Sequence, residues 1–376
     1  MHILIAPNAF KNSLDAMSVA EAIAKGLHQS ELSCTTGCFP VGDGGDGTGE
    51  LLIKKFNGNF ITQQVHDPSG RMIRAAMGLI DDGKTAVIEM AAASGIRLLQ
   101  QDELDPLHAS SYGTGELIKK ALDKNVQKII LCIGGSATVD GGCGILQALG
   151  IRFLDAANSM LMSLPESLTD LSSIDVSGLD QRIAGCEIII LCDVANPLLG
   201  ENGAAKIFGP QKGASKSQVI QLENSLIQFA KTALQITGID MAGIKHGGAA
   251  GGVAAGLHTF LNARMVNGID YFLDITRFDQ ALQKASIVIT GEGSIDLQTL
   301  EGKGPFGVAM RAKKKNIPVI ALAGKVPAES HEELNKCFDL LLSINHEAGD
   351  LQTVLAATQE NLIRSGKQLG DLLASA

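Results

Sequence analysis

Residues 286–323 read SIVITGEGSIDLQTLEGKGPFGVAMRAKKKNIPVIALA, and this stretch decides the fold class. The apolar run 286–290 predicts a buried strand, and the glycine-rich segment after it predicts a loop. Residues 306–315 have a helical pattern, and residues 318–323 form a second apolar run. A strand, a helix and another strand in this order predict a parallel sheet, because parallel neighbours need a crossover connection.

The same alternation occurs at both ends of the chain. The predicted elements there are, in chain order, a strand at 2–6, a helix capped by Ser13, a strand at 37–41, a helix at 48–56, a strand at 339–344 and a closing helix at 351–373. We therefore predict an α/β protein with a Rossmann-like parallel-sheet domain. This domain is discontinuous and is formed by residues 1–60 and 262–376.

The middle of the chain, residues 61–261, has a different pattern. Extended runs at 61–65, 72–79 and 85–90 are joined by turn sequences, which predicts an antiparallel meander. A strand and helix at 128–149, a strand at 188–191 and a helix at 218–237 follow. We predict an inserted mixed α/β domain here.

Composition excludes several classes of function. The chain has 376 residues with 31 basic and 40 acidic side chains, a net charge of −9, which argues against nucleic-acid binding. Aromatic residues make up 4%, too few for a base-stacking surface. The sequence has neither an apolar run of membrane-spanning length nor a signal-peptide pattern, so we expect no membrane association. The 7 cysteines suit a reducing cytoplasmic location, and the oligomeric state, including a homo-oligomer, stays open.

Gly42-Asp43-Gly44-Gly45-Asp46-Gly47 matches the dinucleotide fingerprint G-x-G-x-x-G between a predicted strand and a predicted helix. Asp67 follows about 20 residues after Gly47, the spacing expected of a ribose ligand. However, Asp43 and Asp46 would repel a pyrophosphate docked on backbone N–H groups. The pattern therefore favours a metal or polyol site, and an NAD-dependent dehydrogenase of a small hydroxy acid is kept as an alternative.

Five glycine-rich loops contain charged or hydroxyl residues, and four of them directly follow predicted strands. A backbone-rich loop such as 134–142, GGSATVDGG, can bind phosphate oxygens. Carboxylates bind Mg²⁺ together with substrate phosphates, and lysines neutralise phosphate charge. In open α/β sheets, loops at the carboxyl ends of the strands converge on one crevice. The residue types therefore predict phosphoryl transfer, and we expect these loops to meet at one site.

The same loops resemble those of the type 1 glycerate kinases. The matching segments are APNAFKNSL, FPVGDGGDGT, IGGSATVDGG, DVANPLLG with GPQKG, GGAAGGVAAG and TGEGSIDLQTLEGKGP, and they extend from the first strand past residue 300. The resemblance implies two α/β domains with the active site in the cleft between them. It also implies a kinase that uses ATP and Mg²⁺ to phosphorylate D-glycerate, giving 2-phosphoglycerate in preference to 3-phosphoglycerate.

The candidate residues of these loops fall into groups by chemical role. We predict catalytic roles for Asp193, Lys11 and Asp296, with Asp193 and Asp296 as metal ligands, and substrate-binding roles for Asp43, Asp46 and Lys212. ATP is expected against Gly134, Gly135, Ser136, Thr138, Asp140, Gly248, Gly251 and Glu292. Asp193 is the first choice of general base or metal ligand, followed by Glu292 and Asp296. A sugar-acid sensor without catalytic activity is the second alternative.

Overall fold

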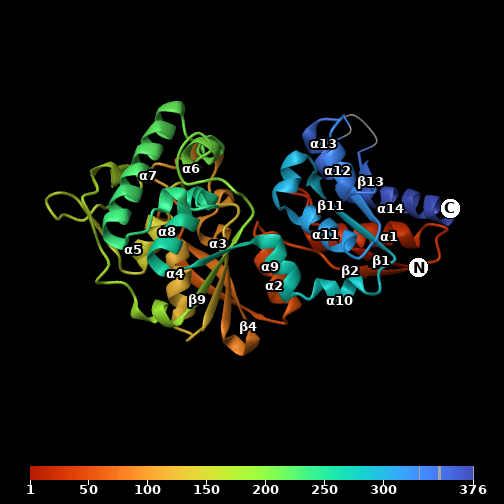
Figure 1. The fold of residues 1–376 in the computed structure, drawn as a ribbon, viewed down its shortest axis with the longest axis horizontal. Helices are drawn as coiled ribbons and strands as arrows, with labels where there is room; N and C mark the ends of the chain where they lie inside the picture. Colours follow the sequence, from red (N-terminus) through yellow and green to blue (C-terminus); the bar gives the residue numbers. More distant parts are fainter. Residues whose placement is uncertain (330, 346–348, 376) are drawn as a thin grey trace. The chain divides into compact units, whose positions relative to one another are not determined.

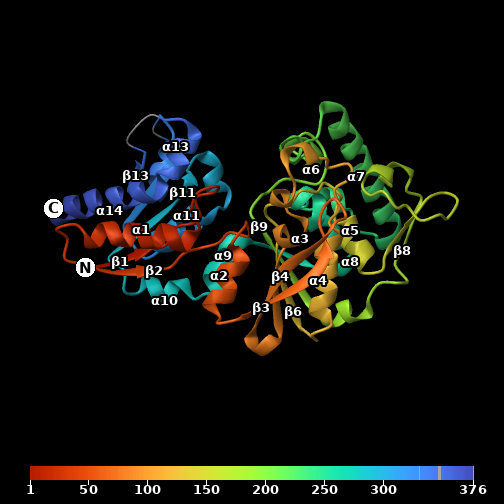
Figure 2. The ribbon, with the colours of Figure 1, turned by 180° about the vertical axis from the view of Figure 1, so that it is seen from behind.

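The structure is a computed structural model that describes residues 1–329, 331–345 and 349–375 (Figures 1 and 2). It divides into two compact units. The first unit contains Met1–Asp43 and Asn267–Ala376, and the second contains Gly44–Val266. One unit therefore contains both ends of the chain. The boundaries fall after Asp43 and after Val266, whereas the sequence predicts them near residues 60 and 262.

The first unit is built on a sheet of five strands in the order β13-β12-β11-β1-β2. These strands are β1 (His2–Ile5), β2 (Thr35–Cys38), β11 (Ile287–Ser294), β12 (Val319–Lys325) and β13 (Leu340–Ser343). All neighbours are parallel, and β1 from the start of the chain pairs with β11 from its end, with Ile3 opposite Ile287. This topology confirms the Rossmann-like parallel sheet made by both chain ends.

Helices of the first unit lie around this sheet, and some of them contact its strands directly. They are α1 (Ala16–His28), α9 (Gly268–Ile275), α10 (Phe278–Leu282), α11 (Gly304–Lys313), α12 (Glu332–Cys337), α13 (Leu351–Ala356) and α14 (Thr358–Ser375). Figures 1 and 2 show α1 and α14 side by side. Their backbones approach closely because Gly26 has no side chain, and a Cβ there would lie 2.2 Å from the Ile363 carbonyl oxygen.

Two helix ends of the first unit differ from the sequence predictions. Asp15, not Ser13, caps α1, because its carboxylate accepts the N–H groups of Met17 and Ser18. The Ser13 hydroxyl instead donates to the Leu355 carbonyl oxygen. The closing helix predicted at 351–373 consists of the separate helices α13 and α14.

The second unit is built on a mixed sheet in the order β10-β9-β6-β5-β4-β3. Its strands are β3 (Asn59–His66), β4 (Met72–Ile80), β5 (Thr85–Glu89), β6 (Lys128–Cys132), β9 (Glu187–Cys192) and β10 (Arg264–Asn267). The β3–β4 and β4–β5 pairs are antiparallel, whereas the β5–β6 and β6–β9 pairs are parallel. The predicted meander and the mixed α/β class are therefore confirmed. A small hairpin of β7 (Arg152–Leu154) and β8 (Ser173–Asp175) was not expected from the sequence.

The helices of the second unit surround this sheet. They are α2 (Thr48–Lys55), α3 (Ala91–Ser94), α4 (Tyr112–Leu122), α5 (Cys143–Ala148), α6 (Ala204–Phe208), α7 (Lys216–Thr237) and α8 (Val253–Leu261). Helix α2 explains why the first boundary precedes residue 60. Its Gly49 N–H donates to the Glu89 carboxylate at 2.7 Å, and its Ile53 packs against Gly78 of β4.

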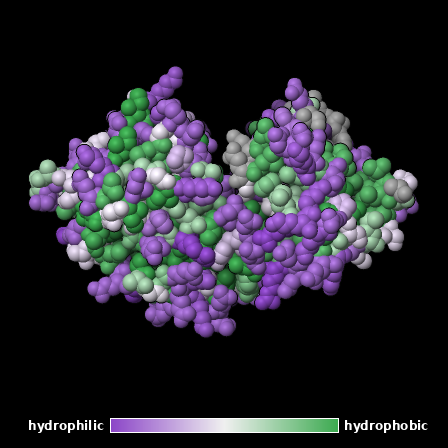
Figure 3. All heavy atoms as spheres, in the orientation of Figure 1, coloured by the Kyte–Doolittle hydropathy of each residue, from purple (hydrophilic) through white to green (hydrophobic). Residues whose placement is uncertain are grey.

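The face of the molecule drawn in Figure 3 carries many hydrophilic residues with apolar areas among them. Some large apolar side chains of the second unit are exposed, including Met162 and Ile220. Within the described part of the chain, no helix is long and apolar enough to cross a membrane.

Candidate functional site

The predicted site residues separate into two groups, one in each unit. The first unit contains Lys11, Asp43, Glu292 and Asp296, and the second contains Asp46, Gly134, Gly135, Ser136, Thr138, Asp140, Asp193, Lys212, Gly248 and Gly251. The two carboxylates of the Gly42–Gly47 loop therefore belong to different units.

In the first unit, the candidate residues follow the carboxyl ends of three neighbouring parallel strands. Asn8 and Lys11 follow β1, Asp43 follows β2, and Glu292 lies in β11. The Asn8 side-chain amide donates to Asp43 Oδ2 at 2.7 Å, and its backbone N–H donates to the Gly291 carbonyl oxygen at 2.8 Å. These contacts tie the three strand ends together, as expected for a ligand site at the edge of a parallel sheet.

Glu292 is the buried carboxylate of this group. The sequence predicts a strand that stops at residue 290, but β11 continues to Ser294 and carries Glu292 into the unit, where it is 8% exposed. The Thr299 hydroxyl donates to its Oε1 at 2.9 Å. Burial raises the pKa of Glu292 to about 7, although the charges of Lys303 and Lys11 oppose this shift. Glu292 can therefore exchange a proton near neutral pH.

Asp296 lies beyond the end of β11, where Thr299 links it to Glu292. The Asp296 N–H donates to the Thr299 hydroxyl oxygen at 3.2 Å, and that hydroxyl donates to Glu292. The sequence pattern predicts site roles for Asp296 and Glu292 but not for Thr299 and Lys303. Both missed residues lie within the quoted segment TGEGSIDLQTLEGKGP, so their polarity in a glycine-containing loop was the available signal.

In the second unit, the glycine loops at 44–47 and 134–136 contact each other through their backbones. The Gly134 N–H donates to the Gly44 carbonyl oxygen at 3.1 Å, and a Cβ on Gly134 would lie 2.5 Å from the Gly45 Cα. Gly135 has a φ of +71°, and a Cβ there would lie 2.4 Å from Asp46 Oδ1. Glycine is required at both positions because any side chain would separate the loops.

Lys212 reaches the same loop from the segment after α6. It is 4% exposed, and its Nζ donates to Ser136 Oγ at 2.8 Å and to the Thr138 carbonyl oxygen at 2.7 Å. Burial lowers the pKa of Lys212 to about 7, although the charge of Asp140 opposes this shift. The Thr138 hydroxyl is buried and has no hydrogen-bond partner among the described residues. The loop thus combines the Gly135 backbone, two hydroxyls and an amine whose protonated form a bound anion would stabilise.

Asp140 has a structural role in this unit. It is fully buried, and its oxygens accept four hydrogen bonds, from the Ser111 N–H and hydroxyl and from the N–H groups of Gly142 and Gly144. These donors occupy the carboxylate and fix the start of α5. A direct contact with a nucleotide is therefore not needed to explain this residue.

Gly248 and Gly251 also have a packing explanation. A Cβ on Gly248 would lie 2.2 Å from the Pro197 carbonyl oxygen, and one on Gly251 would lie 2.1 Å from that of Thr138. The Gly141 N–H donates to the Gly251 carbonyl oxygen at 3.0 Å. The glycine tract therefore supports the 134–142 loop by close backbone contact, in addition to any contact with a ligand.

Asp193 follows directly after β9, whose neighbour β6 leads into the 134–142 loop. The two strands are parallel, with Cys132 opposite Leu191. Asp193 and Gly134 therefore both follow strand ends at the same edge of the sheet. Across residues 1–329, 331–345 and 349–375, no group of three or more His, Cys, Asp or Glu side chains is arranged to bind a metal ion. Mg²⁺ in kinases usually takes only one or two protein carboxylates and completes its shell with phosphates and waters, which fits a single carboxylate such as Asp193.

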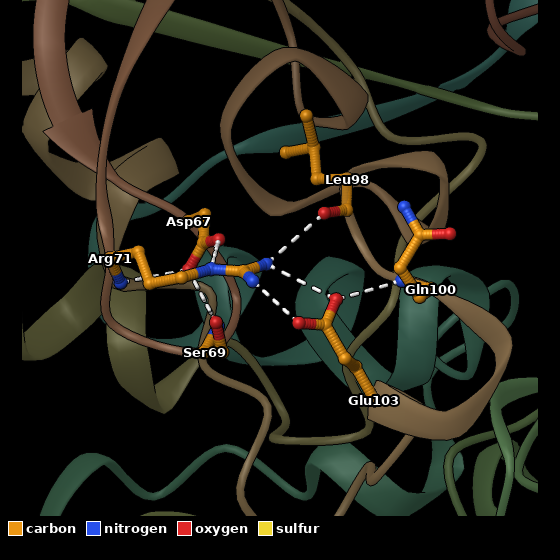
Figure 4. A network of polar contacts seen from close by, with 6 residues as sticks. All are labelled: Asp67, Ser69, Arg71, Leu98, Gln100 and Glu103. Carbon is orange, nitrogen blue, oxygen red and sulfur yellow. Dashed lines mark hydrogen bonds and ion pairs between the residues drawn. The ribbon is translucent and has the colours of Figure 1, made fainter.

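Asp67, the residue at the ribose-ligand spacing, is occupied by a structural network (Figure 4). Its Oδ1 accepts from the N–H groups of Ser69 and Arg71 and from the Ser69 hydroxyl, and the Arg71 guanidinium donates to its Oδ2 at 2.6 Å. Burial would raise the pKa of Asp67, but these hydrogen bonds lower it below its usual value. Asp67 therefore closes the turn between β3 and β4. Its carboxylate is occupied by these contacts, so it does not supply the ribose ligand that a dinucleotide site requires.

Comparison with known proteins supports the family resemblance that the glycine-rich loops indicate. The model of the Glycerate kinase family matches residues 3–374. A glycerate kinase from Bacillus subtilis (strain 168) is 43% identical over 98% of this chain and 97% of its own. A glycerate 2-kinase from Escherichia coli (strain K12) is 41% identical over 100% of this chain and 98% of its own. The crystal structure of a protein described as glycerate kinase 2 from Salmonella typhimurium LT2 superposes with a TM-score of 0.84 at 40% identity, covering 100% of this chain and 98% of that one.

Proposed function

The chain belongs to the glycerate kinase family, and from this membership we propose that it transfers the γ-phosphoryl group of ATP to the 2-hydroxyl of D-glycerate. The products are 2-phosphoglycerate and ADP. The choice of the 2-hydroxyl is supported by the full-length relative named glycerate 2-kinase. Both rivals, a dehydrogenase and a sensor without activity, lack such support, and Asp67 is already bound within the protein.

The observation that carries this proposal is the 134–138 loop with Lys212 at its centre. The Gly135 N–H, the Ser136 hydroxyl and a buried amine are the kinds of donor that phosphoryl groups need. A bound phosphate favours the charged form of Lys212 and would raise its pKa from about 7. ATP phosphates are therefore proposed to lie against this loop, with Lys212 neutralising their charge.

Mg²⁺ is proposed to enter with ATP. Asp193 is the proposed protein ligand, because it is a carboxylate at the strand edge next to the phosphate loop. The ion neutralises charge on the phosphate oxygens when it is bound. Asp296 stays a second candidate ligand from the first unit.

The carboxylates of the first unit are proposed to accept the proton of the attacking hydroxyl. Glu292 suits this step because its pKa of about 7 balances availability and basicity near neutral pH. Lys11 and Lys303 lie near enough to act on its charge, and Asn8 orients Asp43. This assignment places Glu292 ahead of Asp193 as the general base.

A coupled ADP-release assay with D-glycerate, L-glycerate, tartronate and lactate tests the reaction. We expect ADP release with D-glycerate that depends on Mg²⁺, and ³¹P NMR of the product should show the phosphate on carbon 2. Absence of ADP release with D-glycerate, or a 3-phosphate product, would contradict the proposal. A change in nicotinamide absorbance with any of these acids would instead support the dehydrogenase.

A cytoplasmic location is proposed from the thiols. All seven cysteines are free, and the four in the second unit, Cys132, Cys143, Cys186 and Cys192, are buried. Free thiols persist in reducing compartments. Purification without reductant, followed by thiol counting under denaturing conditions, would test whether the native protein carries all seven in reduced form.

A further inference from the structure

Arg97 lies beside the proposed phosphate loop, although its own segment is not rich in glycine. The Ile96 N–H donates to the Gly135 carbonyl oxygen at 2.9 Å, and the Ala137 N–H donates to the Ser94 carbonyl oxygen at 2.9 Å. Gly95 and Ser136 form an antiparallel bridge between these bonds. The backbone next to Arg97 is therefore fixed against the loop that carries Gly135 and Ser136.

The Arg97 side chain extends from this fixed backbone toward Asp46. This side chain is 62% exposed, and its Nη1 lies 3.4 Å from Asp46 Oδ2. Among the described residues, this guanidinium forms no other ion pair. An exposed pair at this distance contributes little to stability. A guanidinium has five N–H donors, so most of them are available to a ligand.

Asp46 also has an oxygen that a ligand can use. Its Oδ1 is buried and has no hydrogen-bond partner among the described residues. Gly135 lies against this oxygen, and a Cβ at that position would lie 2.4 Å from it, so a larger residue would crowd the carboxylate. A buried acceptor without a donor is costly, and a hydroxyl group from a ligand would satisfy it.

Arg97 and Asp46 together present a cation and a hydroxyl acceptor side by side. That combination matches a small hydroxy acid, whose carboxylate suits the fork of a guanidinium and whose hydroxyl suits a carboxylate oxygen. A triphosphate matches it poorly, because Asp46 would repel the phosphate oxygens. We propose that Arg97 binds the carboxylate of glycerate while Asp46 accepts a hydrogen bond from one of its hydroxyls. This assignment rests on the proposed function and adds Arg97, which the sequence analysis missed, to the substrate site.

The contacts of Figure 4 stabilise the loop that follows Arg97. The Arg71 guanidinium donates to the Leu98 carbonyl oxygen at 3.2 Å and to Glu103 Oε1 at 2.5 Å, while Glu103 Oε2 accepts the Gln100 N–H at 2.8 Å. Arg71 is in turn paired with the buried Asp67. Arg71 is thus a positioning residue for the segment that carries Arg97.

The test compares R97A, R97K and the control R74A, which changes another exposed arginine of the same unit. Initial rates are measured with D-glycerate and ATP varied separately, together with melting temperatures. For R97A we expect the KM for D-glycerate to rise about 10- to 100-fold, because a charge-assisted hydrogen bond to the substrate is lost. The KM for ATP should stay within about twofold and the melting temperature should be unchanged, since Arg97 has few protein contacts. R97K should restore part of the loss, and R74A should behave as the unchanged protein.

Each other outcome overturns the assignment. A rise in the KM for ATP instead of D-glycerate would place Arg97 on the nucleotide, and unchanged values for both substrates would remove it from the site. A drop in kcat together with the melting temperature would indicate a structural role. If the unchanged protein neither phosphorylates nor binds D-glycerate by calorimetry, the proposed function itself fails. An active protein with an unaffected R97A variant refutes only the role of Arg97.

Discussion

The two units use burial in opposite ways. In the first unit burial raises the pKa of the Glu292 carboxyl to about 7, and in the second it lowers the pKa of the Lys212 ammonium to about 7. The physical cause is the same, because removal from water favours the neutral form of either group. The first unit thereby gains a proton acceptor near neutral pH, and the second gains a donor that becomes charged when an anion binds. Burial is thus the shared cause, and the residue type decides its result. A buried carboxyl suits the proposed proton transfer, and a buried amine suits the proposed phosphate binding.

The largest expected effect comes from Asp193, the carboxylate next to the phosphate loop. D193N should lower kcat about 1000-fold, because asparagine keeps the shape but removes the charge that Mg²⁺ prefers. Steady-state rates across a Mg²⁺ titration are the measurement. D170N, at an exposed aspartate of the same unit, is the control. If D193N turns over nearly as fast as the control, Asp193 is not a residue of the active site.

Lys212 is the next test, since it defines the second unit in this comparison. K212M keeps most of the aliphatic chain but removes the amine that contacts Ser136 and Thr138. We expect kcat/KM for ATP to fall roughly 100- to 1000-fold, as for loss of a preorganised donor to a transferring phosphoryl group. K216M, at the exposed start of α7, is the matched control. A fall in kcat/KM for D-glycerate alone would move Lys212 to the acceptor substrate.

Glu292 provides the pH test of the first unit. Its pKa of about 7 predicts that kcat/KM rises with pH through neutrality as the carboxyl loses its proton. E292Q should lower kcat about 100-fold and remove this rising limb. Full pH profiles of the unchanged protein, E292Q and the exposed control E332Q would show it. A rising limb that persists in E292Q would assign the proton step to another group.

The same variant has a stability signature with a definite sign. The folded-state pKa of Glu292 is raised above its ordinary value of 4.5, so its ionisation destabilises the fold as pH rises from about 4.5 to 7. E292Q lacks this cost. Its unfolding free energy relative to the unchanged protein should therefore increase by roughly 1–3 kcal/mol between pH 5 and pH 8. Denaturant titrations at both pH values measure the difference, and a constant difference would mean that the carboxyl is solvated.

The smallest expected effect concerns the contacts behind Arg97. R71A removes the donors to Leu98, Glu103 and Asp67 but leaves Arg97 in place. We expect the KM for D-glycerate to rise roughly fivefold, about the worth of one hydrogen bond, with a lower melting temperature. The fall in melting temperature distinguishes this positioning role from the role of Arg97. An R71A variant with wild-type KM would show that the loop keeps its position without the network.

The strand-and-loop pattern was sufficient to predict the fold class. Buried apolar runs followed by glycine-rich loops specify parallel strands with polar groups at their carboxyl ends. The first sheet has this arrangement throughout, and the second has it in the β5, β6 and β9 strands. Glu292 could be predicted as a site residue for that reason, since it lies two residues after the apolar run SIVIT. The burial of Glu292 could not be predicted from the sequence. It depends on the extension of β11 past residue 290, which pairs with β12 and places Glu292 opposite Ala323.

Arg97 and Asp140 show two opposite limits of predicting site residues from the sequence. Arg97 lies in the ordinary segment SGIRLLQ, and only pairing with the 135–137 segment brings it to Asp46. Asp140 lies inside the most conspicuous glycine loop, yet four donors from its surroundings occupy it. Proximity to a motif in the sequence is therefore a weaker guide to a ligand role than the unused hydrogen-bonding capacity of the side chain.

The sequence by itself determined the α/β class, the parallel sheet shared by both chain ends, the family and the loops that carry polar groups, because these depend on local periodicity and on residue types in short segments. Only the tertiary structure decided which polar groups are buried, which are already hydrogen-bonded and which remain available. Those properties depend on neighbours that are distant in the sequence, such as Gly135 beside Asp46 or Lys212 beside Ser136. Burial and partnering set the pKa and the binding capacity of each group, so the chemistry of the site is settled by packing.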